Sequence, residues 1–313
     1  SSIYYYIILF IFYYYFIFFF FLYMAHEEYQ YLQLITNVII NGDDIEGRNG
    51  NTRMIFGTQM RFNLGDNIIP FLTTKKLAWK TCLKELLWFI SGSTNNTILK
   101  NNKVHIWDAN GSKEFLESRG LNYEEDDLGP VYGHQWRHFN APYNNCNTDY
   151  SNKGVDQLNN VIKMLKDPKE KYSRRIILSA WNPCQLDEMA LPPCHVLMQF
   201  NVSKNDELSC ILYQRSGDIG LGVPFNIASY SLLTHLLAHH CNLKPKEFIH
   251  FIGNAHIYSN HIKPLKEQID RTPYEFPTLR ISNKYNNIED YKFEDFVIEN
   301  YKSHNKIEME MSA

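Results

Sequence analysis

The sequence predicts an α+β protein with a large mixed β-sheet and flanking helices. Its 313 residues include 44% hydrophobic and 21% charged side chains, which is ordinary globular usage. Segments with helical spacing and segments with alternating spacing are interspersed without a strict strand–helix–strand rhythm. From Met24 onward no linker rich in Pro, Gly or Ser divides the chain and no repeat recurs. Residues 24–313 are therefore predicted to form one domain.

The charge balance and the cysteines exclude several classes of protein. The net charge is −3, from 31 basic and 34 acidic residues, so no obligatory nucleic-acid partner is expected. The six cysteines form no CxxC motif, and the histidines lack metal-ligand spacing, so we expect no metal. This usage predicts a reduced, cytoplasmic protein.

Residues 1–23 differ from the rest of the chain. Ile3 to Tyr23 contains only Ile, Tyr, Leu and Phe, and its 21 residues are long enough to cross a bilayer. No Lys or Arg flanks the segment, and seven of its residues are tyrosine. The four residue types share AT-rich codons, so we favour translated non-coding DNA over a membrane anchor. We exclude the segment from the fold argument.

Four helices are predicted. Three have one apolar face, and the fourth is apolar all round, which indicates a helix buried on every side. The amphipathic helices cover residues 26–40, 77–90 and 155–166, and the buried helix covers 227–241.

Alternating or apolar runs predict six strands. The clearest is 207–215, in which Leu208, Cys210, Leu212 and Gln214 share one face. The others cover residues 53–64, 174–181, 194–202, 248–252 and 278–282. Residues 43–52 and 140–153 are polar and are predicted to be loops.

Cys194 is the first candidate for chemistry. Two prolines precede it at the entrance of a predicted strand, and a thiol held on a rigid turn suits nucleophilic attack. A buried structural cysteine is the alternative. His195 follows directly and is expected to point to the opposite face of the strand, which makes it a poor candidate for the direct base.

Arginines and one carboxylate form the second group of candidates. Arg174 and Arg175 open one predicted strand, Arg215 closes another, and Arg48 lies in a loop. Such arginines can bind phosphate or carboxylate through two nitrogens, although for any single one of them a solvated surface position is the better expectation. Glu85 interrupts an apolar helix face, so it is either partnered or functional.

Two further segments offer ligand contacts. Gly220 to Asn226 contains two glycines that allow close approach of a ligand, and Asn226 either contacts a pyrimidine edge or caps the following helix. His256 and Tyr258 alternate on one strand face and could reach a sugar hydroxyl.

Together these segments resemble the thymidylate synthase family over nearly all of residues 24–313. The sequence of these segments is similar to that of the synthase half of protozoan bifunctional dihydrofolate reductase–thymidylate synthases. The motifs that carry the resemblance are Lys84-Glu85-Leu86-Leu87-Trp88-Phe89, Ile106-Trp107-Asp108-Ala109-Asn110-Gly111, Asp127 to Gly133, Met189 to His195, Gln214-Arg215-Ser216, Gly220 to Asn226 and Gly253 to Tyr258.

The resemblance implies the thymidylate synthase fold and a homodimer that packs sheet to sheet with shared sites. It implies reductive methylation of dUMP to dTMP, with 5,10-methylenetetrahydrofolate as cosubstrate and dihydrofolate as product. Cys194 would add to C6 of the uracil, and Arg215 would favour its thiolate. Ala313 would close over the ligands.

The resemblance also assigns site residues. The catalytic set is Cys194, Glu85, Arg215, Asn226 and Tyr132. The dUMP-binding set is Arg48, Arg174 and Arg175 (both from the partner subunit), His195, Gln214, Arg215, Ser216, Gly217, Asp218, Asn226, His256 and Tyr258. The folate-binding set is Trp107, Asn110, Asp218, Gly222, Phe225 and Ala313.

Departures from the family pattern leave alternatives open. The loop around Arg48, Ala78 and the terminal Met311-Ser312-Ala313 differ from what is usual, which predicts weaker folate binding and looser closure. A pyrimidine nucleotide hydroxymethylase is the nearest rival, and an RNA-binding regulator is a rival of another class. Whether a reductase domain is fused upstream stays open.

Overall fold

The computed structural model describes residues 26–47 and 50–310. The expectations for residues 1–23, Arg48 and Ala313 fall outside these described residues. No helix in the described ranges combines the length and the apolar character that a bilayer span needs.

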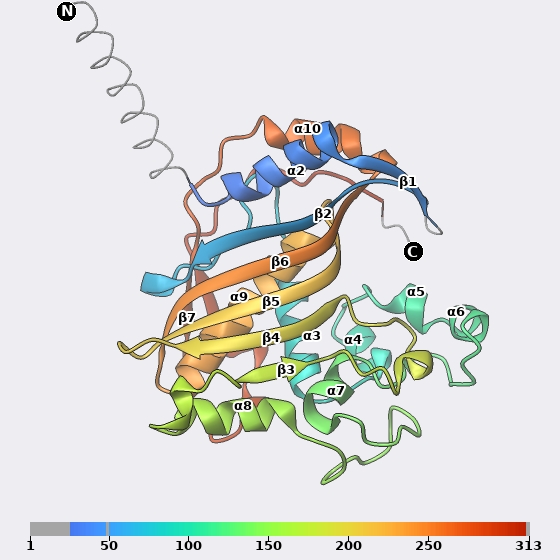
Figure 1. Cartoon of the computed structure of the whole chain (residues 1–313), viewed down its shortest axis with the longest axis vertical. Coiled ribbons are helices and arrows are strands. Elements are labelled where there is room, and N and C mark those ends of the chain that lie inside the picture. Colours follow the sequence, from blue (N-terminus) through green and yellow to red (C-terminus); the bar gives the residue numbers. More distant parts are fainter. Residues whose placement is uncertain (1–25, 48–49, 311–313) are drawn as a thin grey trace, which may run out of the picture.

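A six-stranded sheet forms the centre of the molecule (Figure 1). Its order is β1 (Asp43–Gly47), β2 (Gly50–Asn63), β6 (Lys244–Tyr258), β5 (Glu207–Asp218), β4 (His195–Val202) and β3 (Ile177–Ser179). β5 and β6 run parallel, and the other neighbours are antiparallel. The predicted large mixed sheet is confirmed.

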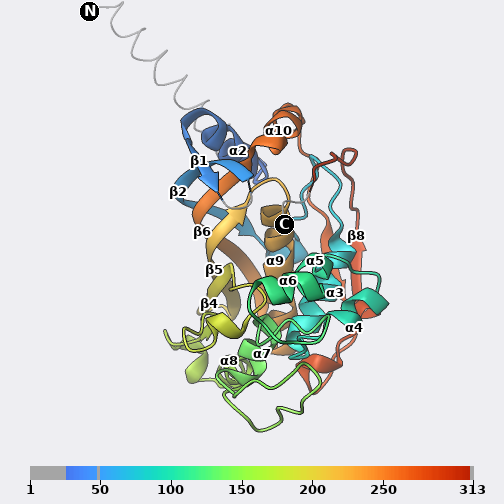
Figure 2. The same cartoon turned by 90° about the vertical axis from the view of Figure 1, so that its right-hand side faces the viewer.

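Helices cover one face of this sheet (Figures 1 and 2). α9 (Gly222–His240) lies against β5 and β6 and is buried along most of its length, as its apolar sequence predicts. α3 (Trp79–Ile90) packs on α9, and α2 (Tyr29–Asn41) packs on β2 and α10 (Ile262–Ile269). The remaining elements are α4 (Asn96–Asn101), α5 (Asp108–Gly111), α6 (Lys113–Ser118), α7 (Tyr132–His138), α8 (Gln157–Lys166) and the antiparallel pair β7 (Thr278–Ile281) and β8 (Phe296–Glu299).

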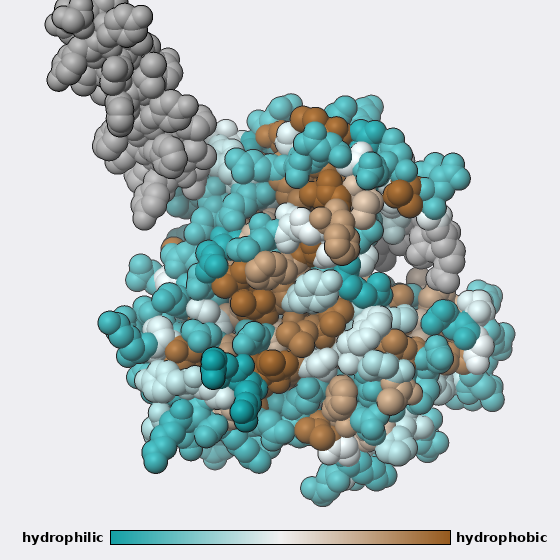
Figure 3. Space-filling model, in the orientation of Figure 1, coloured by the Kyte–Doolittle hydropathy of each residue, from teal (hydrophilic) through white to brown (hydrophobic). Residues whose placement is uncertain are grey.

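The opposite face of the sheet carries apolar side chains, and no layer of helices from residues 26–47 and 50–310 covers it (Figure 1). The register places Tyr213 beside Phe251, and Ile177 shares this face through its pairing with Gln199 and Ile211. Tyr213, Phe251 and Ile177 are 42%, 36% and 41% exposed. Apolar colour runs across this face in the space-filling view (Figure 3). We call it the open sheet face.

Several predicted boundaries are wrong for identifiable reasons. Residues 43–47 and 50–52 form β1 and the start of β2, although the sequence predicts a loop for this part of the chain; the pattern does not reveal β1 because all five of its residues are exposed and show no alternation. The strand predicted at 174–181 is only β3, so Arg174 and Arg175 lie in a turn before it. β5 continues past Arg215 to Asp218. Asn226 does not cap α9, because the helix begins four residues earlier.

The buried carboxylate of Glu28 joins the start of α2 to residues 73–74. Glu28 is fully buried, and its oxygens accept hydrogen bonds from the backbone N–H and the hydroxyl of both Thr73 and Thr74 at 2.6–3.0 Å. Thr74 in turn accepts a hydrogen bond from Gln268 of α10. This network joins α2 and α10 to the irregular segment that precedes α3.

Glu28→Gln is predicted to lower the free energy of unfolding by about 3 kcal/mol, because an amide nitrogen would replace one acceptor and face buried donors. Urea unfolding followed by circular dichroism measures the change. The matched control is Glu114→Gln on the exposed surface of α6, which is expected to change stability by less than about 0.5 kcal/mol. Equal effects of the two substitutions would contradict the role of this network.

Candidate active site

Three adjoining cavities open at the end of the sheet nearest α5. The polar cavity, of about 530 Å³, is lined by Gly47, Gly50, Thr52, Arg215, Ser216, Asn254, His256 and Tyr258. The cysteine cavity, of about 240 Å³, includes Cys194, Tyr132, Gln214 and Trp107. The apolar cavity, of about 450 Å³, includes Leu77, Phe225, Ile307 and Met309. Ser216 lines the first two, and Glu85, His195, Asp218 and Asn226 line the last two.

Cys194 lies on the turn directly before β4. The hydroxyl of Tyr132, on α7, accepts hydrogen bonds from the backbone N–H of Cys194 at 2.8 Å and of His195 at 3.3 Å. The Cys194 carbonyl accepts one from the Arg215 backbone N–H at 2.9 Å. These bonds fix the sulfur-bearing residue between α7 and β5, so Tyr132 acts on the backbone of the turn.

The expectation that His195 faces away from Cys194 is wrong. A register shift between His195 and Leu197 pairs His195 with Gln214 and Leu197 with Tyr213. Such a β-bulge re-aims a side chain. Cys194 itself lies on the turn before β4, where strand alternation does not apply, and Cys194 and His195 line the same cavity. Burial lowers the pKa of His195 to about 4, so its ring is neutral and still a poor base at neutral pH.

A chain of hydrogen-bonded polar side chains runs through Asn226. His250 Nε2 lies 2.8 Å from Gln214 Oε1, and Gln214 Nε2 donates to Asn226 Oδ1 at 2.9 Å. Asn226 Nδ2 lies 2.7 Å from His195 Nε2. Gln214 Nε2 also donates to the Ser216 carbonyl, so both of its hydrogens are used. The orientation of each amide in the chain is thereby determined.

Arg215 connects the cysteine to the polar cavity. Its Nε and one Nη donate to the carbonyls of Pro193 and Pro192 at 2.8 and 2.9 Å, and its guanidinium lies over the Trp181 ring. Burial raises the pKa of the Cys194 thiol above its ordinary value, and Arg215 opposes that rise. Arg215 thus lowers the pKa of the Cys194 thiol, as expected, but burial raises that pKa by more.

Glu85 projects from α3 into the cysteine and apolar cavities and is hydrogen-bonded. The Trp107 indole Nε1 donates to its carboxylate at 2.7 Å. Burial raises the pKa of Glu85 to about 7, and the bond from Trp107 acts against that rise. A carboxyl group that titrates near neutrality can both accept and donate a proton.

Asp218 lies where the C-terminal segment approaches the cavities. Its carboxylate accepts a hydrogen bond from the Gly220 N–H at 2.9 Å and lies 3.8 Å from His261 Nδ1. His261 is fully buried, and its Nε2 lies 2.6 Å from the Glu310 carbonyl. Ile307 and Met309 of this segment line the apolar cavity. The segment is thus part of the site.

The structure brings most of the predicted site residues together. Fifteen of them line the three cavities: Cys194, Glu85, Arg215, Asn226, Tyr132, His195, Gln214, Ser216, Asp218, His256, Tyr258, Trp107, Asn110, Gly222 and Phe225. Arg174 and Arg175 are exposed and line none of the three, and Gly217 packs against Ile252 and Val223 instead. Arg48 and Ala313 lie outside the described residues.

Sequence reasoning missed two groups of residues. His250, which orients Gln214, stands between Phe248 and Ile252 on the buried face of β6, and a polar residue in that apolar alternation was an available signal. Lys75, Lys76 and Lys306 line the apolar cavity and come from distant, irregular segments that no periodicity marks. Within residues 26–47 and 50–310, no group of three or more His, Cys, Asp or Glu side chains is arranged to hold a metal ion.

The site therefore places a cysteine, a side chain that can act as a nucleophile, between a polar cavity bordered by Arg215 and an apolar cavity. The chain matches the thymidylate synthase family over residues 29–313. It belongs to that family.

Its relatives include separate and fused synthases. The chain is 56% identical over 290 residues to a human thymidylate synthase, covering 92% of this chain and 91% of that protein. It is 53% identical over 293 residues to a bifunctional dihydrofolate reductase–thymidylate synthase of Plasmodium chabaudi, covering 93% of this chain and 50% of that protein. A bifunctional protein of Paramecium tetraurelia is 53% identical over 290 residues, covering 92% of this chain and 62% of that protein. The chain thus spans about half the length of several curated relatives.

Arg215→Gln is predicted to raise the pKa of the Cys194 thiol, because it removes the positive charge that opposes the effect of burial. Alkylation of Cys194 by iodoacetamide at pH 8, followed by peptide mass spectrometry, should slow about tenfold for each unit of that rise. Arg280→Gln, a substitution at a side chain that is 58% exposed on β7, is the control and should leave the rate unchanged. Unchanged alkylation in Arg215→Gln would refute the electrostatic role of Arg215.

Proposed function

We propose that this chain is a thymidylate synthase that converts dUMP to dTMP with 5,10-methylenetetrahydrofolate and releases dihydrofolate. The observation that carries the proposal is the placement of Cys194 and the oriented amide of Asn226 in one cavity. This cavity lies between a polar cavity and an apolar one, in a chain of this family.

The nucleotide would lie across the polar and cysteine cavities. Arg215 and Ser216 would bind the 5′-phosphate, and His256 and Tyr258 would contact the deoxyribose. Arg48, and Arg174 and Arg175 of a partner copy, would complete the grip on the phosphate. Gly217 packs against neighbouring side chains and does not line a cavity. We therefore propose that it acts by allowing the backbone of β5 to pass close to those side chains.

The orientation of Asn226 favours uracil over cytosine. Its Oδ1 accepts from Gln214 and its Nδ2 faces His195, which leaves one acceptor site and one donor hydrogen for a base. Uracil presents a matching N3–H donor and O4 acceptor. Cytosine presents the reverse pattern, and the neighbours of Asn226 oppose a rotation of the amide that would accept it.

The chemistry would begin with the addition of the Cys194 sulfur to C6 of the uracil. A C–S bond forms, and electron density moves to C5, which becomes the nucleophile for carbon–carbon bond formation. C5 would then lose its proton as the bond between the transferred carbon and the folate nitrogen breaks. A hydride from the folate would reduce that carbon to the methyl group, and the C–S bond would break when the product leaves. Glu85, with a pKa of about 7, would organise proton transfer at the base.

The apolar cavity fits a reduced folate. Leu77, Ile106 and Phe225 offer apolar contact, and Asp218 offers a carboxylate to the N–H groups of a pterin. Trp107, Asn110 and Gly222 border the same space in the cysteine cavity, and Ala313 would extend the tail that contributes Ile307 and Met309. When bound, the folate supplies the one-carbon unit and the hydride. Neither hydroxymethylation nor RNA binding is favoured by a specific observation.

We further propose a homodimer that buries the open sheet face. Large apolar side chains there include Tyr213, Phe251 and Ile177, and an apolar face of this kind marks an interface. The proposed reaction also needs a reduced Cys194 thiol, which a reducing compartment such as the cytoplasm maintains. Residues 24–313 would form one synthase domain, and a fused reductase stays open.

The first test follows dihydrofolate absorbance and product mass with dUMP and methylenetetrahydrofolate. Dihydrofolate and dTMP should appear together, and Cys194→Ala should lower the rate by at least about 10⁴-fold because it removes the nucleophile. Hydroxymethyl-dUMP without dihydrofolate would contradict the synthase proposal. So would turnover that survives the substitution.

The second test concerns the dimer. Phe251→Asp should convert the dimer to a monomer in sedimentation experiments, because it places a charge in an apolar interface. The matched control is Ile40→Asp, at a residue that is 69% exposed on α2, away from the open sheet face.

Subunit mixing tests the shared site. Cys194→Ala and Arg175→Gln should each be inactive alone, and mixing them should restore partial activity, because one of the two sites in a mixed dimer then has an intact Cys194 from one subunit and an intact Arg175 from the other. A monomeric parent protein, or no restoration from mixed dimers, would contradict the shared site.

A further inference from the structure

The short helix α5 carries two residues of the site but cannot maintain its own position. It has four residues, Asp108–Gly111, and so short a helix is not stable by itself. Trp107 directly precedes it and donates its indole hydrogen bond to Glu85, while Asn110 lines the cysteine cavity. Contacts outside α5 must therefore set the position of Trp107.

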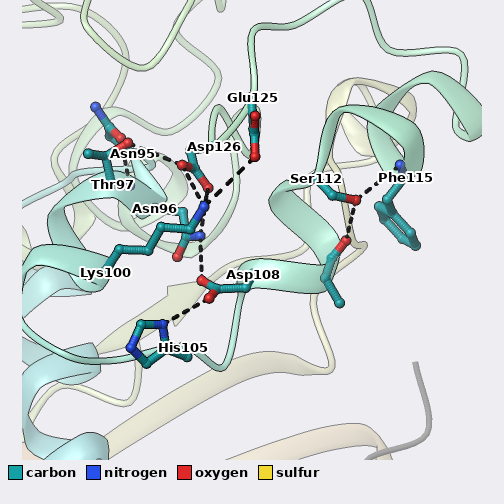
Figure 4. A network of polar contacts seen from close by, with 11 residues as sticks. Asn95, Asn96, Thr97, Lys100, His105, Asp108, Ser112, Phe115, Glu125 and Asp126 are labelled. Atoms are coloured by element: carbon teal, nitrogen blue, oxygen red, sulfur yellow. Dashed lines mark hydrogen bonds and ion pairs between the residues drawn. The ribbon is translucent and has the colours of Figure 1, made fainter.

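The side chain of Asn96 fixes the beginning of α5. Asn96 is fully buried at the start of α4, and its Nδ2 lies 3.1 Å from Asp108 Oδ1 and 2.8 Å from Asp126 Oδ1 (Figure 4). The two hydrogens of one amide thus join two carboxylates. Lys100 lies 2.8 Å from Asp126 and supplies the positive charge that this pairing of carboxylates requires.

The backbone of Asp126 fixes the other end of α5. Its N–H donates to the Gly111 carbonyl at 2.8 Å, and its carbonyl accepts from the Asn96 N–H at 2.9 Å. Gly111 lies so close that a Cβ there would be 3.1 Å from Asp126 Oδ1 and 3.3 Å from Asn96 Nδ2. Both ends of α5 are therefore held by the same pair of residues.

We propose that Asn96 and Asp126 are positioning residues that hold α5 so that the Trp107 indole meets the Glu85 carboxylate. We call this arrangement the α5 clamp. It rests on the proposed function, in which Glu85 moves protons at the base. Neither residue lines any of the three cavities, so the clamp acts only through α5.

The clamp should be visible in the titration of Glu85. Loss of the Trp107 hydrogen bond leaves burial unopposed, so the pKa of Glu85 rises above about 7 and its ionised form requires a higher pH. Other titratable groups near Glu85 or in its cavities are Cys82 on α3, Tyr132 on α7, Tyr230 on α9, and Cys194, His195 and Asp218.

The test uses Asn96→Asp, which keeps the shape but removes the donor and adds a third carboxylate. Infrared difference spectra of the ligand-free protein, with Glu85→Gln as the blank, follow protonation of this carboxyl group against pH. The midpoint should rise by about one pH unit, as in Trp107→Phe. The double variant should show no larger shift than either single one. In the dependence of kcat on pH, the midpoint of the acidic limb should rise by the same amount.

Asn95→Ala is the matched control. The Asn95 side chain caps α4 through the Thr97 N–H, so its loss weakens the same helix without touching Asp108 or Asp126. It should lower thermal stability and leave the Glu85 midpoint unchanged. Asp126→Asn serves as a second clamp variant if Asn96→Asp does not fold.

The outcomes separate the clamp from the proposed function. A shifted carboxyl midpoint in a protein that makes no dTMP would support the clamp and overturn the function. Normal turnover with an unshifted midpoint in both clamp variants would overturn the clamp. An equal shift in Asn95→Ala would also overturn it, because general weakening of α4 would then be sufficient.

Discussion

Four polar side chains, three of them buried, pair with one another between the sheet and α9, and the site depends on that pairing. His250 on β6, Gln214 on β5, Asn226 on α9 and His195 on β4 form one hydrogen-bonded chain. Buried donors and acceptors left unpaired are costly, so the register of the strands and the helix that completes the chain is favoured. The same register presents one oriented amide to the cavity. The packing of these elements therefore also determines the amide that we propose for the recognition of the base.

The environment of Cys194 illustrates a compromise between folding and reactivity. Burial favours the neutral thiol, and Arg215 favours the thiolate but remains weaker in the ligand-free protein. The carbonyls of Pro192 and Pro193 hold the guanidinium near the cysteine, at the border of the polar cavity. One cation thereby lies beside both the Cys194 thiol and the polar cavity that we propose for the phosphate of the substrate. Tyr132 binds the backbone N–H of Cys194, so it fixes the turn while Cys194 still lines the cavity.

The sequence predicts the regular parts of this molecule well. Long periodic segments such as α9 and β5 are identified because burial forces their side-chain patterns. Cys194 and Glu85 stand out because each is chemically unusual in its segment. β1 and α5 are missed because an exposed strand shows no alternation and four residues show no period. The β-bulge at His195 and the cavity wall from Ile307 and Met309 depend on tertiary contacts that no local pattern records.

The central claim is that Cys194 attacks a uracil that Asn226 holds in the cavity next to the folate. Incubation with methylenetetrahydrofolate and the 5-fluoro analogue of dUMP tests it directly, because C5 of the analogue cannot lose a proton and the adduct accumulates. Mass spectrometry of the digested protein should find both nucleotide and folate on the Cys194 peptide. An unmodified Cys194 peptide, or an adduct on another cysteine, would contradict the account.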